Sequence, residues 1–157
     1  MSSVTVAQFK TAVWRFISSQ IVSLVANPQV IWLEQGVPRP KLPYVGLKVI
    51  SGPRAYGEDD MRQSSPGVYS IEGQRAFTVS VNIFAANAEE ISGVLTSAMS
   101  KPSALEALAA SFVALLDNTP PQNVSVALET KFENRIQFDI TFGCVMATTD
   151  NVGFIEQ

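Results

Sequence analysis

The sequence predicts an α+β fold in which helices pack on one face of a mainly antiparallel sheet of about four to five strands. Two stretches, QRAFTVSVNIFA (residues 74–85) and RIQFDITFGCVM (residues 135–146), alternate strictly between apolar and polar residues. This alternation is typical of strands with one buried face. Three other stretches repeat apolar residues at helical spacing, and the order helix, strands, helices, hairpin favours helices segregated from an antiparallel sheet. Because the chain has 157 residues, we expect one domain over residues 1–157.

The first predicted element is a helix that begins at Thr5. Thr5 and Gln8 have the spacing of a capping box, in which each side chain binds the backbone N–H of the other residue. A stripe of apolar residues follows at 3.6-residue spacing, and Asn27-Pro28 ends the helix because the residue before a proline avoids helical geometry. We therefore expect this helix to cover the sheet.

Strands are predicted at residues 30–33 and 44–50, joined by the proline-rich extended connection of residues 34–43. The two alternating stretches then define one buried face of the sheet. We expect this face to contain Phe77, Val79, Val81, Ile83, Ile136, Phe138, Ile140 and Phe142.

Two more helices are predicted between the alternating strands. The first follows Asn87 and extends through Met99. The second begins at a capping box formed by Ser103 and Glu106, and its apolar residues are Leu105, Leu108, Phe112, Leu115 and Leu116. A strand over residues 123–132 and a turn near residues 133–134 then lead into the last strand.

A polar stretch over residues 51–73 separates the strands and contains four glycines and two prolines. We expect it to be a long loop, and loops of this length in a compact domain are usually functional or disordered. Arg54, Tyr56 and Met61 are residue types that are enriched at protein interfaces. Residues 53–66 are therefore predicted to serve assembly, with a mobile surface loop as the alternative.

The chain offers little for catalysis. It contains no histidine, which excludes Ser-His-Asp and Cys-His arrangements. Its only cysteine, Cys144, is in phase with the apolar residues of its strand, so we expect a small buried hydrophobe. The acidic group GEDDMR (residues 57–62) is either a Mg²⁺ or Ca²⁺ site or, as we expect, a solvated surface segment. Phosphate-binding glycine motifs do not occur in the sequence. The prediction is a non-enzyme that needs no cofactor.

Charge and hydropathy restrict the partners. The formal net charge is −3, so the basic surface needed to grip a phosphate backbone is missing. The stretch SSVTVAQFK after Met1 does not resemble a secretory signal, and no apolar run is long enough to span a membrane. We expect a protein made in the cytoplasm that binds neither a membrane nor a specific nucleic-acid sequence.

Three stretches and a closing segment carry a resemblance to a known family. They are PYVGLKVIS, QRAFTVSVNIFAANAEE, ETKFENRIQFDITF and DNVGFIEQ. Their defining positions are Pro43-Tyr44, Arg75-Ala76-Phe77 and Phe132-Glu133-Asn134-Arg135, with Ile155-Glu156 at the end. In this order they resemble the tail terminator, or neck terminator, proteins of phages with contractile tails.

The resemblance implies a structural virion protein of the tail and neck, made in the host cytoplasm. Such a protein forms a ring, expected to be hexameric, that caps the tail tube and joins it to the head-side connector. Its implied partners are further copies of itself, the tail tube and the connector, with the sheath as an additional candidate, while DNA passes through without specific binding. The alternatives are a head-closure or tail-completion connector and a small metal- or ligand-binding domain.

The interface expected for such a ring combines the polar stretch with the turn before the last strand. Glu133 and Arg135 are placed to form an ion pair, either between subunits or within one hairpin. The complete predicted interface is Arg54, Tyr56, Glu58, Asp59, Asp60, Met61, Arg62, Glu133 and Arg135.

Overall fold

The structure, a computed structural model, describes residues 2–22, 24, 29–33, 38, 40–127 and 132–153, with the backbone alone at 126–127 and 132–133. The described elements include three helices, α1 (Val6–Ile21), α2 (Ala88–Ala98) and α3 (Pro102–Ala110). The strands are β1 (Gln29–Trp32), β2 (Tyr44–Ala55), β3 (Asp60–Ser65), β4 (Val68–Phe84), β5 (Val113–Asn118), β6 (Gln122–Asn123), β7 (Val126–Ala127), β8 (Phe132–Glu133) and β9 (Arg135–Asn151).

The expected sheet of four to five mainly antiparallel strands is wrong, because the main sheet has seven strands and is mixed. Its order is β1-β2-β4-β9-β5, with β3 beside β4 and β6 beside β9. β1 pairs with β2 in parallel, since the connection between Trp32 and Tyr44 is long enough to return the chain to the same end of the sheet. β7 and β8 form a separate two-stranded sheet.

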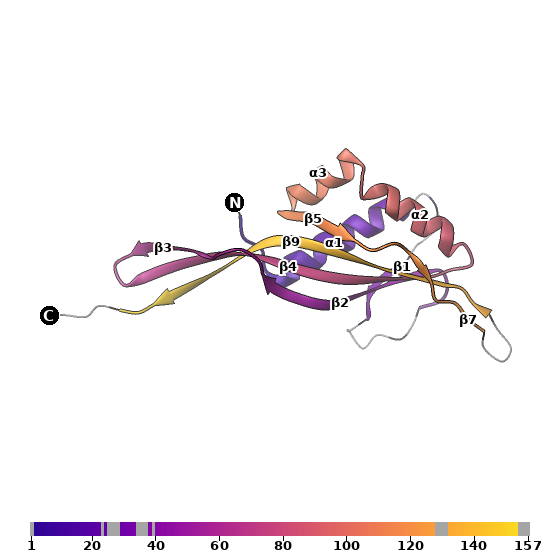
Figure 1. The fold of residues 1–157 in the computed structure, drawn as a ribbon, viewed down its shortest axis with the longest axis horizontal. Coiled ribbons are helices and arrows are strands. Elements are labelled where there is room, and N and C mark those ends of the chain that lie inside the picture. Colours follow the sequence, from indigo (N-terminus) through magenta and orange to yellow (C-terminus); the bar gives the residue numbers. More distant parts are fainter. Residues whose placement is uncertain are drawn as a thin grey trace.

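All three helices lie over one face of the sheet (Figure 1). The predicted buried face is confirmed: Phe77 lies opposite Phe142, and the pairs continue in register to Ile83 opposite Ile136. Each of the eight side chains predicted for this face is at most 4% exposed. Phe9 of α1 stacks on Phe77 with 4.1 Å between ring centroids and meets the edge of Phe142. The body of the molecule is thus a helical layer on a sheet.

The predicted start of α1 is also confirmed. The Gln8 backbone N–H donates to the Thr5 hydroxyl oxygen over 3.2 Å, and the Thr5 N–H donates to Gln8 Oε1 over 2.9 Å. Both bonds satisfy amides that have no partner within the helix.

The predicted helix over residues 103–116 is wrong in both its start and its end. Pro102 is the first helical residue, and Ser103 makes no capping bond. The helix stops at Ala110, where Phe112 adopts a left-handed backbone with φ 61° and its N–H donates to the Ala109 carbonyl. The next residues form β5, in which Val113 pairs with Cys144 of β9. Pairing with β9 therefore overrides the local helical spacing.

The polar stretch of residues 51–73 is built as strands, so its expected loop structure is wrong. β2 extends to Ala55, β3 covers residues 60–65, and β4 starts at Val68. Pro66-Gly67 makes the turn between β3 and β4, with Gly67 at φ 76°, as the third position of a type II turn requires. The predicted strand over residues 123–132 is only partly testable, because residues 128–131 lie outside the described part of the chain.

Candidate functional site

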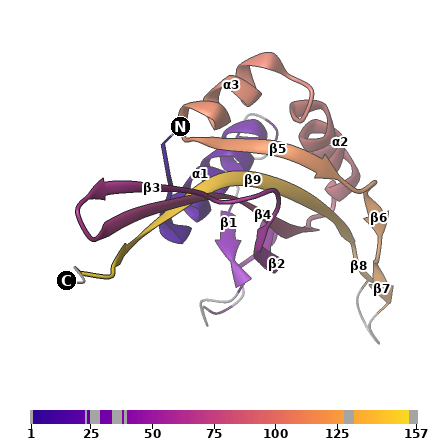
Figure 2. The ribbon, with the colours of Figure 1, turned by 60° about the vertical axis from the view of Figure 1, so that its left-hand side comes forward.

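The most distinctive surface of the molecule is a three-stranded arm that extends beyond the helices (Figures 1 and 2). We define the arm as β3 with residues 68–73 of β4 and residues 146–151 of β9. The pairing of β4 with β9 continues without a register shift from Phe84 opposite Arg135 to Val68 opposite Asn151. β3 replaces β2 as the neighbour of β4, with Met61 opposite Ile71. Consequently the arm is a direct continuation of the body sheet.

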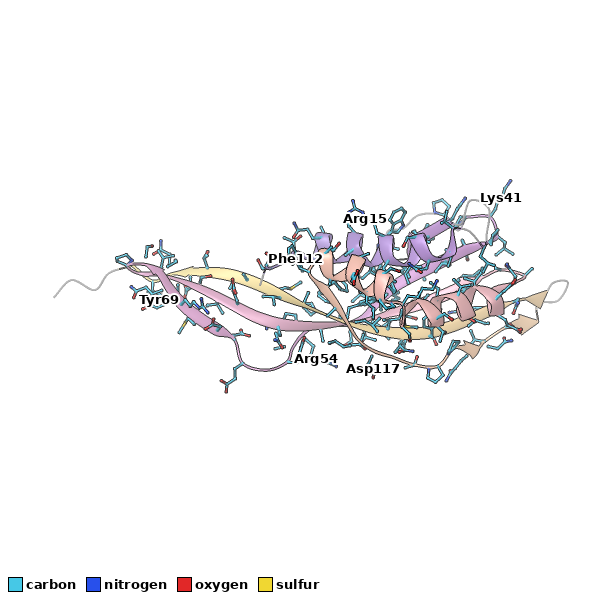
Figure 3. All side chains as sticks on the ribbon, turned by 90° about the horizontal axis from the view of Figure 1, so that it is seen from above. Arg15, Lys41, Arg54, Tyr69, Phe112 and Asp117 are labelled. Carbon is cyan, nitrogen blue, oxygen red and sulfur yellow. The ribbon has the colours of Figure 1, made fainter. Side chains whose placement is uncertain are left out.

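The arm has one apolar and one polar face, because side chains alternate along each strand. The apolar face has the same phase as the helix-covered face of the body and contains Met61, Gln63, Tyr69, Ile71, Met146, Thr148 and Asp150. The opposite face contains Asp60, Arg62, Ser70, Glu72, Ala147 and Thr149. Met61 is 64% exposed, and no helix lies over this end of the sheet (Figure 3). The arm therefore continues the phase of the buried face beyond the helices, with Met61 exposed and Tyr69 and Ile71 only partly buried.

An ion pair marks the point where the arm joins the body. Arg75 Nη1 and Nη2 donate to the two oxygens of the Asp59 carboxylate, over 2.9 and 3.0 Å. This hydrogen bonding holds the pKa of Asp59 below its usual value. Gly73 lies beneath the pair, and a Cβ there would collide with the Asp59 carboxylate and the Arg75 guanidinium. The absence of a side chain at Gly73 thus allows the pair to form.

The remaining predicted residues near the arm have separate roles. Asp60 accepts a bond from Arg62 Nε over 2.9 Å, so Asp59 and Asp60, two of the three acids of GEDDMR, each bind an arginine of the chain itself. Tyr56 packs its hydroxyl over Gly143 and borders a cavity of about 250 Å³ that Phe112 also lines. Arg54 and Glu58 are exposed at the base of the arm. Seven predicted interface residues are therefore brought together on or beside the arm.

The other two predicted interface residues lie at the opposite end of the molecule. Glu133 belongs to β8, and Arg135 begins β9, both far from β3 in Figure 1. Arg135 Nη2 donates to Asn82 Oδ1 over 2.7 Å, and its guanidinium lies 5.1 Å from the centre of the Phe84 ring. The side chain of Glu133 lies outside the described part of the structure. Arg135 is thus held against the face of its own sheet that lies opposite the helices, where Asn82 and Phe84 are buried.

A groove between α1 and α3 is a second candidate surface, which the sequence reasoning missed. It has a volume of about 590 Å³, and its lining includes Trp14, Arg15, Phe16, Val22, Ala107 and Leu108. Trp14 is 42% exposed and Val22 is 62% exposed. The Trp14 indole N–H donates to the Val30 carbonyl over 2.8 Å, which fixes the ring at the edge of the groove. The groove is therefore a largely apolar hollow on the helical layer.

Signals for the arm were present in the sequence. Pro66-Gly67 is a strong turn pair, and Tyr69 and Ile71 continue the alternation of β4 in the direction of its start. The groove had no such signal, because it depends on how two helices distant in sequence pack together.

Burial raises the pKa of the Cys144 thiol, which is 5% exposed and faces the core. No group of three or more potential metal ligands occurs within the described ranges. Among the helices described, none is sufficiently long and apolar to cross a membrane.

Comparison with known proteins identifies the family of the chain. A family model described as phage neck terminator protein matches residues 7–157, which is nearly the whole chain. The search of curated proteins found no match to the chain. The matched range includes both the arm and the α1–α3 groove, and the closing Ile155-Glu156 of the sequence resemblance lies outside the described residues.

Proposed function

Since the chain belongs to the phage neck terminator protein family, we propose that it forms a hexameric ring that caps the tail tube and joins it to the head-side connector. The family has a structural role in the phage tail and neck, so the protein is a structural component of the virion. We further propose that the phage has a contractile tail and that DNA passes through the ring without specific binding.

The observation that supports a ring best is the uncovered apolar face of the arm. An isolated sheet needs a second layer to bury its apolar face. The helices supply this layer for the body but not for Met61, Tyr69 and Ile71. A closed ring built from head-to-tail contacts requires two different complementary surfaces on every subunit. A projecting arm provides one of these surfaces.

The proposed contacts extend the predicted interface. Arg54, Tyr56, Glu58, Asp59, Asp60, Met61 and Arg62 form or adjoin the arm and are proposed to face a neighbouring subunit. Glu133 and Arg135, at the far end, are proposed to contact a different partner, which is the tail tube, the sheath or the connector. The separation of these two groups along the molecule is what suggests two kinds of contact.

The first experiment measures the mass and shape of the purified protein. A hexamer of a 17.0 kDa chain has a mass of about 102 kDa, which light scattering distinguishes from a monomer, and negative-stain images reveal a central hole. We expect rings that bind isolated tail tubes lacking a terminator. A stable monomer at all concentrations that never joins a tube would contradict the proposal.

A deletion variant tests the contribution of the arm. Removing residues 58–72 joins Gly57 directly to Gly73, and the Tyr56 N–H already donates to the Gln74 carbonyl over 3.2 Å. Gly57 has φ 76°, so a Gly-Gly turn can close the shortened hairpin. We expect a cooperatively melting monomer that no longer forms rings. Normal rings from this variant would show that the arm is dispensable for assembly.

A further inference from the structure

No helix covers the arm face that carries Met61, Tyr69 and Ile71, and the α1–α3 groove is a largely apolar hollow on the helical layer. We propose that the apolar face of the arm of one copy docks in the α1–α3 groove of a second copy, with Asp150 of the first beside Arg15 of the second. This inference rests on the proposed ring and assigns the two surfaces that would join its subunits.

The arm's face has the composition of a docking surface. Met61 and Ile71 lie directly opposite each other, and Tyr69 occupies the next row toward the tip. These side chains continue the phase of the buried face of β4. The helices, however, do not extend over the arm, where Tyr69 lies (Figure 3). A partner that covers it must therefore bring an apolar surface of its own.

The groove supplies such a surface, and the arm of the same copy cannot reach it. The arm extends along the long axis of the molecule and away from α1 and α3 (Figures 1 and 2). Trp14, Val22 and Leu108 give the groove an apolar lining with room for large side chains. Trp and Tyr are enriched at interfaces because their large rings bury much apolar area. A contact between unlike surfaces of two copies is also the type that closes rings.

The charges at the two surfaces are complementary. Arg15 lies at the groove and is exposed, and Asp150 lies on the apolar face of the arm in the row of Gln63 and Tyr69. Neither side chain forms an ion pair within the described part of the chain. Opposite charges at the rim of an interface favour correct partners, and like charges brought together oppose association. The pair therefore fixes the orientation of the arm in the groove.

Charge reversal in both surfaces tests the inference. The variants are Asp150→Arg, Arg15→Asp and the two combined, and the readout is the concentration at which half of the chains are assembled, measured by light scattering. We expect each single reversal to raise this concentration at least about tenfold, and the double variant to restore it to within about threefold of wild type. Glu72→Arg is the matched control, because it makes the same charge change on the polar face of the arm.

Each other outcome contradicts a specific statement. The docking inference is overturned if rings assemble normally with either single reversal. It is also overturned if the double variant assembles no better than the single variants. Neither result contradicts the ring itself. A Glu72→Arg effect as large as that of Asp150→Arg also overturns the docking inference, since the arm would then use its other face. A wild-type chain that never assembles contradicts the proposed ring itself.

The fluorescence of Trp14 gives a second readout. Trp14 is half-exposed in the groove, whereas Trp32 is buried in the body. On assembly we expect the emission of a Trp32→Phe variant to shift to shorter wavelength, as Trp14 loses contact with water. An unchanged emission on ring formation would place the contact elsewhere and overturn the inference.

Discussion

The two halves of the long β4–β9 ladder have the same pairing but opposite environments. In the body, Phe77, Ile83 and Phe138 lie beneath the helices and are at most 1% exposed. In the arm, Ile71 continues the same phase of the ladder but is only partly buried, and Met61, opposite it on β3, is exposed. Strand alternation therefore determines which face of the sheet a side chain occupies. Whether that face is buried depends on what else covers it.

The largest expected effect is in the body. Phe138→Ala should lower the free energy of unfolding by about 3–5 kcal/mol, because it removes a fully buried ring from a close-packed core. Thr141→Ala, on the opposite face of β9, removes a methyl group and a hydroxyl that lies 3.2 Å from the Thr78 hydroxyl, and should cost about 0.5–1.5 kcal/mol. Urea denaturation measures both, and equal losses would mean that the two faces have been exchanged.

A smaller effect than that of Phe138→Ala is expected at the boundary between the halves. Gly52→Ala should cost about 1–3 kcal/mol, because Gly52 has φ 110° in a distorted part of β2. A Cβ there would also collide with the Ala76 carbonyl oxygen and approach Phe77 Cα to 2.9 Å. Gly93→Ala is the control, since a Cβ at this helical position meets nothing within 4 Å and should be neutral or stabilising. Thermal melts that rank the two variants in the reverse order would refute this explanation.

Two isoleucines of β4 compare the halves directly. Ile83→Ala, in the body, should cost about 2–5 kcal/mol. Ile71→Ala, in the arm, should cost about 1 kcal/mol in the monomer, since Ile71 is only partly buried there. The same substitution should weaken ring formation, measured by light scattering. A large loss of monomer stability from Ile71→Ala would show that the arm already has a covering layer within one chain.

The smallest effect concerns the ion pair between the halves. Arg75 lowers the pKa of Asp59 in the folded chain from its ordinary value of 3.8, so the pair stabilises the fold fully above that pH. The stabilisation is lost as the pH falls through the lower, folded pKa. Asp59→Asn should therefore melt slightly below wild type at pH 7, and the difference should vanish near the acid limit of folding. A difference that grows on acidification would have the wrong sign for this pair.

Sequence patterns determined the local features of this protein. The Thr5–Gln8 capping box starts α1, and the alternation in β4 and β9 identifies all eight predicted residues of the buried face. Both signals depend on neighbouring residues, because capping bonds and the two-residue period of a strand are properties of a short segment. The order of these segments also supports the family, which the match over residues 7–157 establishes.

Tertiary structure decided which elements the ambiguous segments adopt. Residues 113–116 have helical spacing in the sequence, yet Val113 and Leu115 pair with Cys144 and Phe142. The stretch of residues 51–73 is polar enough to suggest a loop. Along the chain, however, it forms the last residues of β2, then β3, then the first residues of β4. Strand pairing is a contact between distant segments, so a polar strand has no local signature apart from its turns.

The candidate site divides in the same way. Arg54, Tyr56 and Met61 could be selected from residue type and from the unusual length of their segment. The sequence could not show that Glu133 and Arg135 lie at the other end of the molecule, or that α1 and α3 enclose a groove. A segment's own residues determine its faces, whereas the packing of the whole chain determines which faces are covered and which remain available to a partner.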